Sequence, residues 1–261
     1  MGLVGSSSVS LQARSVARQG SGTTCLHVLE PSATPAFSAS NGANVQISCG
    51  VMVESNSATA FSVSGGTTVK ASTVWVFGGS TVTGGSTVTP APVTGVPRQG
   101  DPLAYLNAPA VGACTDFDTV VGGGQTKTLG PGVYCNGITL GNGAHVTFSP
   151  GTYILKGGGL SIGGGVTATG TGVTFYNTAG EGNAYAPFSF HNGANVTLSA
   201  PTTGPLAGML LFQDRSIVSA EVNSFQGGTF VSLTGTLYFP TTPISYSGGT
   251  NVGAYSIIVA R

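Results

Sequence analysis

The amino-acid sequence predicts an all-β fold, a single-stranded right-handed parallel β-helix (β-solenoid) with coils of about 20 residues. Three observations predict it: a short motif that recurs along the chain, a Gly-Gly or Asn-Gly pair in each strong copy, and a very low content of charged residues. The right hand is the one that parallel crossover connections generally adopt.

The recurring motif reads apolar, small polar, apolar, small polar, then Asn-Gly or Gly-Gly, then small polar residues and Val. Copies lie at 37–45, 61–69, 80–88, 138–146, 160–166 and 188–196, with weaker ones at 225–228 and 244–249. The alternation predicts strands with one inward face, and the Gly or Asn residues suit turns with positive φ. Most Gly pairs follow one another by about 19 to 24 residues, which is too short for a propeller blade of about 40.

Charged residues make up 6% of the 261 residues, with eight acids and eight bases, where soluble domains carry roughly 25%. Sheets of exposed hairpins need charged residues to protect their edge strands from pairing with other chains. In stacked coils, by contrast, the backbone groups of one coil form hydrogen bonds with those of the next, so fewer charges are needed. Eight basic residues are too few to neutralise the phosphates of a nucleic-acid backbone, and we therefore expect no nucleic-acid partner. The 40% hydrophobic content indicates a folded core rather than disorder.

We expect one β-helix domain over residues 25–261 with three departures from the repeat. Residues 1–24 form an N-terminal arm or cap, and residues 90–113 carry five prolines and form an excursion across one face between coils. Residues 179–187 form a loop insertion that leaves the solenoid. No apolar run approaches 18 residues and no secretory signal is visible, so we expect this chain to lack a signal or membrane helix.

Four cysteines stand at intervals close to the coil length. Cys25 and Cys49 are 24 residues apart, and Cys114 and Cys135 are 21 apart. Because residues one coil apart lie on strands about 4.8 Å apart, we predict the disulfides Cys25–Cys49 and Cys114–Cys135. A zinc site is the alternative, but there is no CxxC and the histidines are scattered, so neither a metal nor another cofactor is expected. Disulfides favour a secreted, cell-surface or periplasmic location.

Two pairs of charged residues are candidates for a polar site. Asp116 and Asp118 have the i, i+2 spacing of one strand face and could bind calcium together with backbone carbonyls, or form a solvated loop pair. Asp214 and Arg215 could form an ion pair or cap the excursion at 212–225. Glycosidases need two carboxylates beside the glycosidic bond that they cleave. Because this chain has only eight acidic residues, we expect it to carry no catalytic residues.

Thr-x-Thr motifs form a second candidate. Thr81, Thr83, Thr87 and Thr89 make two such motifs close together, and a third lies at 167–169. Flat threonine arrays on a solenoid face can order water at an ice-like spacing. The competing interpretation is that threonine is favoured in strands generally.

Several longer motifs carry a family resemblance. They lie at 25–33, 44–53, 131–135, 150–155, 172–177, 211–215 and 234–240. Together they resemble the Gly/Ser/Thr-rich C-terminal region of bacterial TadE/TadG-like proteins, which are associated with tight-adherence (Flp) pili. The resemblance implies an exported, envelope- or surface-associated protein. Such proteins usually begin with a membrane helix and a pseudopilin-like region, and we expect neither within these 261 residues. The stretch 129–134 is also similar to the ice-binding adhesin family.

These observations predict a non-catalytic extracellular or cell-surface β-helix module associated with tight-adherence pilus biogenesis or adhesion. One alternative is a carbohydrate-binding or polysaccharide-active β-helix, and another is an ice-binding adhesin-like protein. The expected partners are pilus or envelope components, or surface glycans. The open ends of a solenoid could also support end-to-end self-association.

Overall fold

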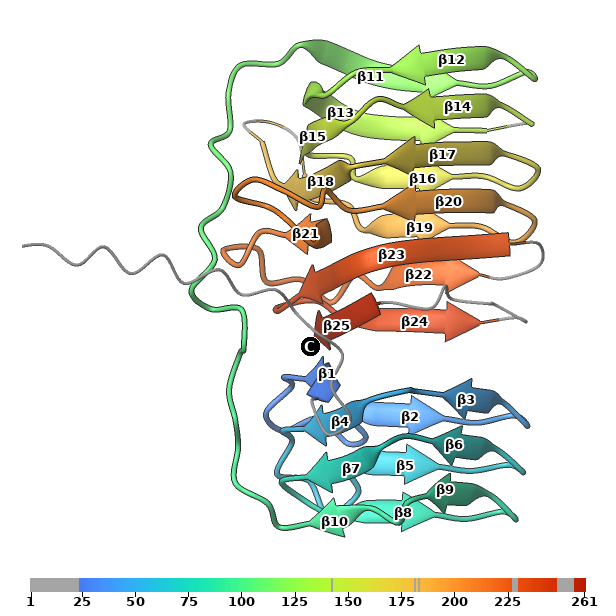
Figure 1. Cartoon of the computed structure of the whole chain (residues 1–261), viewed down its shortest axis with the longest axis vertical. Helices are drawn as coiled ribbons and strands as arrows, with labels where there is room; N and C mark the ends of the chain where they lie inside the picture. The colour runs from blue at the N-terminus through green and yellow to red at the C-terminus, as the bar shows by residue number, and fades with distance from the viewer. Residues whose placement is uncertain (1–23, 142, 181, 183, 227–229, 248–255) are drawn as a thin grey trace, which may run out of the picture.

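The computed structural model describes residues 24–141, 143–180, 182, 184–226, 230–247 and 256–261. It confirms the predicted all-β fold: the chain is a parallel β-solenoid of about ten turns with coils of about 22 residues (Figure 1). The described residues contain no helix that could cross a membrane. The predicted arm or cap lies outside the described residues except for Thr24, the first residue of strand β1 (Thr24–Val28).

Each coil passes through three faces, which we call A, B and C. Face A contains β1, β4 (Gly50–Val53), β7 (Thr73–Val76), β10 (Val93–Thr94), β15 (Gly151–Lys156), β18 (Val173–Thr178), β21 (Met209–Gln213) and β25 (Ser256–Ala260). Face B contains β2 (Phe37–Ala39), β5 (Phe61–Val63), β8 (Ser80–Val82), β16 (Leu160–Ile162), β19 (Phe188–Phe190), β22 (Asn223–Gln226) and β24 (Ile244–Ser247). Face C contains β3 (Asn44–Gln46), β6 (Thr68–Lys70), β9 (Thr87–Thr89), β12 (Thr126–Leu129), β14 (His145–Phe148), β17 (Thr167–Thr171) and β20 (Asn195–Ser199). Three longer strands turn a corner: β11 (Asp116–Val121) and β13 (Gly132–Leu140) run from face A to face B, and β23 (Phe230–Phe239) runs from face C to face A.

Alternating side chains build the core as the sequence motif predicts. Phe61 and Val63 of β5 point inward and are fully buried, whereas Ser62 between them lies on the outer surface. Strand β16 repeats this pattern with Leu160 and Ile162. Because successive described coils add such residues to the same column, the interior holds two clusters of aliphatic and aromatic side chains, one within residues 28–76 and one within residues 121–260.

The coils do not stack in sequence order. Strands β1 to β10 form one stack, which we call the N-terminal stack, and β11 to β25 form the C-terminal stack. The two meet where β25 pairs in parallel with β1, with Ile258 beside Leu26 and Ala260 beside Val28. Figure 1 shows the N-terminal stack below the last coil of the C-terminal stack, so the first described strand lies in the middle of the solenoid.

Residues 95–113, which we call the strap, connect the two stacks. The strap contains no described strand and runs along one side of the solenoid from β10 to the far end at β11 (Figure 1). It corresponds to most of the predicted Pro-rich excursion, although that region also includes β10, which pairs with β7.

The strap covers the outer surface of face A. Outward-pointing residues of successive strands form a third apolar cluster with strap residues Leu103 and Leu106: Val133, Ile154, Tyr176, Phe212, Tyr238 and Val259. The middle of face A in the C-terminal stack is therefore buried on both sides, and this explains why β18 and β21 are buried along their whole lengths.

The described part of the predicted insertion at 179–187 packs back onto the coils. The side-chain amide of Asn177 donates a hydrogen bond to the carbonyl of Ala186 at 2.8 Å, and the amide of Gly158 donates one to Ala184 at 3.0 Å. These bonds hold the C-terminal half of the segment against the neighbouring coils.

Candidate functional site

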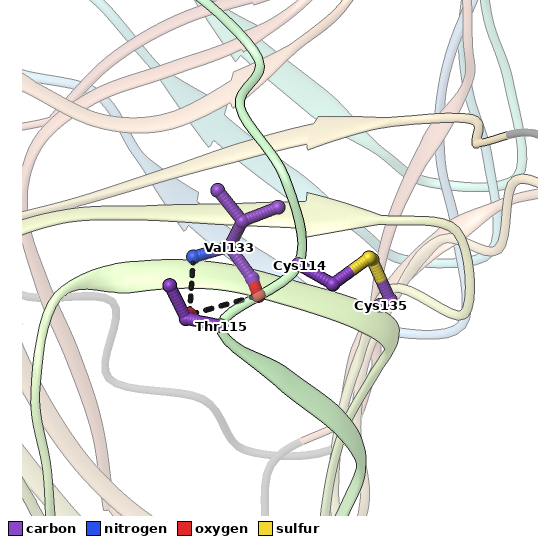
Figure 2. The surroundings of a disulfide bond; sticks show 4 residues. All are labelled: Cys114, Thr115, Val133 and Cys135. Atoms are coloured by element: carbon purple, nitrogen blue, oxygen red, sulfur yellow. Dashed lines mark hydrogen bonds between the residues drawn. A yellow bond between two sulfur atoms is a disulfide. The ribbon is translucent and has the colours of Figure 1, made fainter.

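The four cysteines pair as their spacing predicts. The Cα atoms are 5.8 Å apart in Cys25–Cys49 and 5.7 Å apart in Cys114–Cys135. Figure 2 shows the second disulfide next to Thr115, whose hydroxyl accepts a bond from the amide of Val133 at 2.9 Å and donates one to its carbonyl at 3.0 Å. The disulfide and these bonds fix the end of the strap to β13. Two disulfides indicate a non-reducing environment.

Asp116 and Asp118 lie at the open end of the C-terminal stack, on β11. Both side chains are exposed. The pairing register shifts between Phe117 and Thr119, and Asp118 itself has φ of 49°, so it stands at the corner between faces A and B. This bulge interrupts the strand alternation on which the expectation of a shared face rested.

Asp214 caps its own turn after β21. Its carboxylate accepts hydrogen bonds from the amide and hydroxyl of Ser216, both at 2.8 Å, and from the hydroxyl of Thr178 at 2.7 Å. Partial burial alone would raise the pKa of Asp214, but these hydrogen bonds outweigh it and lower the pKa below the ordinary value. The carboxylate is therefore held ionised as a structural acceptor.

Arg215 binds the strap. Its guanidinium donates to the carbonyls of Leu103 at 2.6 Å and Leu106 at 2.7 Å, and to the hydroxyl of Tyr238. The same Tyr238 hydroxyl donates to Asp101 of the strap, and the guanidinium lies 5.0 Å from the centre of the Tyr238 ring. The two adjacent charges thus serve separate structural contacts.

The four charged candidates do not form one site. Along face A, strands β13, β15 and β18 separate β11, which carries Asp116, from β21, which precedes Asp214. Within the described part of the chain, no three His, Cys, Asp or Glu side chains are grouped as metal ligands would be.

The predicted threonine candidates are divided between two faces. Thr81 lies on β8 of face B beside Ser62, and Thr83 follows that strand. Thr87 and Thr89 lie on β9 of face C, where Thr87 is paired with Thr68 and Thr89 with Lys70. These four residues therefore do not form one threonine surface.

A more extensive threonine surface lies on face C of the C-terminal stack. One outward column, which we call the threonine ladder, consists of paired residues on five successive strands: Thr128, Thr147, Thr169, Thr197 and Ser232. The four threonines are exposed. Beside the ladder, a second column contains Thr126, His145, Thr167 and Asn195, and a third contains Thr171, Ser199 and Thr234.

The strand geometry makes this surface regular in two directions. Neighbouring parallel strands are about 4.8 Å apart, and alternate residues on one strand are about 6.6 Å apart. The inward residues between the ladder positions, such as Val146 and Ala168, are buried and hold each strand in register. The surface offers hydroxyl donors and acceptors, together with methyl groups, on a rigid lattice.

Sequence reasoning found only part of the ladder, the motif at 167–169. The signal was present in the repeat, because Thr147, Thr169 and Thr197 each follow an inward residue by one position. Aligning the copies by their inward residues would have shown the column.

No protein-family model, curated protein or solved structure matches this chain.

Proposed function

We propose that this chain is a non-catalytic extracellular or cell-surface module that binds its partner through the threonine ladder and acts in adhesion or tight-adherence pilus biogenesis. The observation that carries the proposal is the ladder itself, an exposed, regular hydroxyl surface on a rigid sheet. The two disulfides support a location outside the reducing cytoplasm. The motif resemblance to TadE/TadG-like proteins supports the pilus context.

The chemistry of the surface suits a partner with a repeated structure. Each hydroxyl contributes little alone, but a periodic partner such as a glycan or a pilus fibre can engage several at once, and linked weak contacts add up to strong binding. Asp214 and Arg215 are already engaged in structural contacts, which supports binding rather than catalysis.

The test compares two surfaces of the same solenoid. A Thr147→Asp/Thr169→Asp variant places two carboxylates on the ladder, whereas Thr139→Asp places one on the exposed outer side of β13 on face B. In a deletion strain complemented with each variant, we expect the ladder variant to lose adherence or glycan-array binding at least tenfold while Thr139→Asp retains it. Equal adherence of both variants, or a cytoplasmic product, would reject the proposal.

The alternative of a polysaccharide-active β-helix has its own test. Release of reducing or unsaturated sugars that is lost on Asp116→Ala or Asp214→Ala would favour it over a binding module.

The ladder also favours ice binding as a second candidate function. Four stacked threonines present hydroxyl and methyl groups at a constant interval, the arrangement that can order water. Purified protein would then show thermal hysteresis, and Thr169→Tyr in the middle of the ladder would abolish it. Hysteresis that survives this substitution, or its absence from the unmodified protein, would reject ice binding by this surface.

A further inference from the structure

Face B lacks one strand where the two stacks meet. On face A, both β25 and β1 lie between β23 and β4. On face B, no described strand lies between β24 and β2, and β2, β5 and β8 form a separate sheet. Figure 1 shows this interruption between β24 and β2, beside the continuous pair β25 and β1. We call this position the face B slot.

Core residues on both sides of the slot are incompletely buried. Phe37 of β2, and Ile244 and Tyr246 of β24, occupy inward positions but remain partly exposed. The equivalent Phe61 and Leu160 in other coils are fully buried. The hydroxyl of Tyr246 is buried and has no hydrogen-bond partner among the described residues. Partly exposed apolar side chains and strand edges without a described partner therefore border the slot, next to a buried hydroxyl that lacks a described partner.

The other face B strands show what sequence fits such a position. Their outward position is occupied by serine in six strands: Ser38, Ser62, Ser161, Ser189, Ser224 and Ser245. In most of them the serine stands between two apolar inward residues. Residues 1–23 contain this apolar-Ser-apolar triplet once, as Val9-Ser10-Leu11.

We propose that Val9-Ser10-Leu11 of this chain occupies the face B slot as a parallel strand, with Ser10 between Ser245 and Ser38. The chain length fits: twelve residues, 12–23, separate Leu11 from β1, whereas ten, 40–49, separate β2 from β4. A strand in the slot would continue through face C directly into β1, just as β2 leads through β3 into β4. It would cover Phe37 and Tyr246 with the side chains of Val9 and Leu11.

Engineered cysteines test the position. Outward residues on adjacent parallel strands are close enough for a disulfide, so a Ser10→Cys/Ser38→Cys protein should form a 10–38 disulfide within the monomer under mild oxidation. The matched control is Ser10→Cys/Ser62→Cys, because Ser62 lies one strand further away. Mass spectrometry of unreduced peptides should find the 10–38 link and no 10–62 link. No 10–38 link would overturn the proposal, and a 10–38 link confined to covalent dimers would assign the slot to a second copy instead.

A second measurement tests burial of the triplet. Leu11→Asp should lower the midpoint of thermal unfolding by several degrees because it puts a carboxylate in the core, whereas Ser10→Asp at the outward position should leave it within about one degree. Equal midpoints for the two variants would overturn the proposal. Neither experiment depends on the function of the threonine ladder.

Discussion

Arg261 and Glu30, which are 231 residues apart in the sequence, form an ion pair where the two stacks of coils meet. Beside it, the amide of Leu29 donates a hydrogen bond to the carbonyl of Ala260 at 2.7 Å. Partial burial would raise the pKa of Glu30, but the contacts with Arg261 and Ser32 lower it below the ordinary value. The junction thus joins face A into one continuous sheet although the chain order is interrupted there.

The close approach of successive coils can be tested with two glycines of similar conformation. Gly158 has φ of 70°, and a Cβ atom there would lie 2.1 Å from the carbonyl oxygen of Asn136 in the preceding coil. Gly124 has φ of 72° but nothing within 4 Å. Alanine should therefore cost about 1 kcal/mol of unfolding free energy at Gly124 and several kcal/mol at Gly158. Urea unfolding of both variants checks this, and equal losses would contradict the close coil contact.

Arg215 should hold the strap against face A. Arg215→Met removes its bonds to the carbonyls of Leu103 and Leu106, and we expect a loss of about 2 kcal/mol in unfolding free energy. Limited proteolysis should show faster cleavage between residues 95 and 113. The control is Lys127→Met, which removes an exposed charge on β12. If the strap resisted proteolysis equally in Arg215→Met and in the unmodified protein, contacts other than those of Arg215 would be enough to hold it against face A.

The architecture of single coils could be predicted from the sequence because it depends on local patterns. Alternation places Phe61 and Val63 inward, and the coil length pairs Cys114 with Cys135. The order of the coils could not be predicted, because any two coils with apolar inward residues can stack. That order depends on pairs such as Val28 and Ala260, at opposite ends of the described chain.

The candidate site was harder to predict for a related reason. The threonine ladder takes one residue from each of several strands, so it exists only once their register is known, as between Thr147 and Thr169. Two of the partners of Arg215, Leu103 and Leu106, lie more than a hundred residues earlier in the sequence, on the strap. The adjacent Asp214 was the nearest charge in sequence but not its partner in the structure.

The Cys114–Cys135 disulfide should stabilise the far end of the solenoid. Replacing both cysteines by serine releases a crosslink that spans 21 residues, and we expect a loss of about 3 kcal/mol in unfolding free energy. Reduction of the unmodified protein should cost more, because it also opens Cys25–Cys49. Mass spectrometry of unreduced peptides checks the pairing, and a link between Cys25 and Cys114 would refute it.

His27 should make the stability of the junction depend on pH. The side chain is 6% exposed on β1, and its Nδ1 has no hydrogen-bond partner among the described residues. Burial lowers its pKa below 6.5, although a bond to Thr24 and the nearby carboxylates of Glu54 and Asp101 partly oppose this.

The sign of the effect follows from proton binding. Because the folded-state pKa of His27 is lowered, the unfolded chain binds a proton more readily than the folded chain below about pH 6.5, so the free energy of unfolding should fall as the pH drops below that value. Glu30 and Asp214, whose pKa values are lowered, reduce stability only below about pH 4.5. Urea unfolding across this range should show a slope that His27→Gln removes and that His145→Gln, exposed on β14, retains. A slope unchanged in His27→Gln would assign the pH dependence to another group.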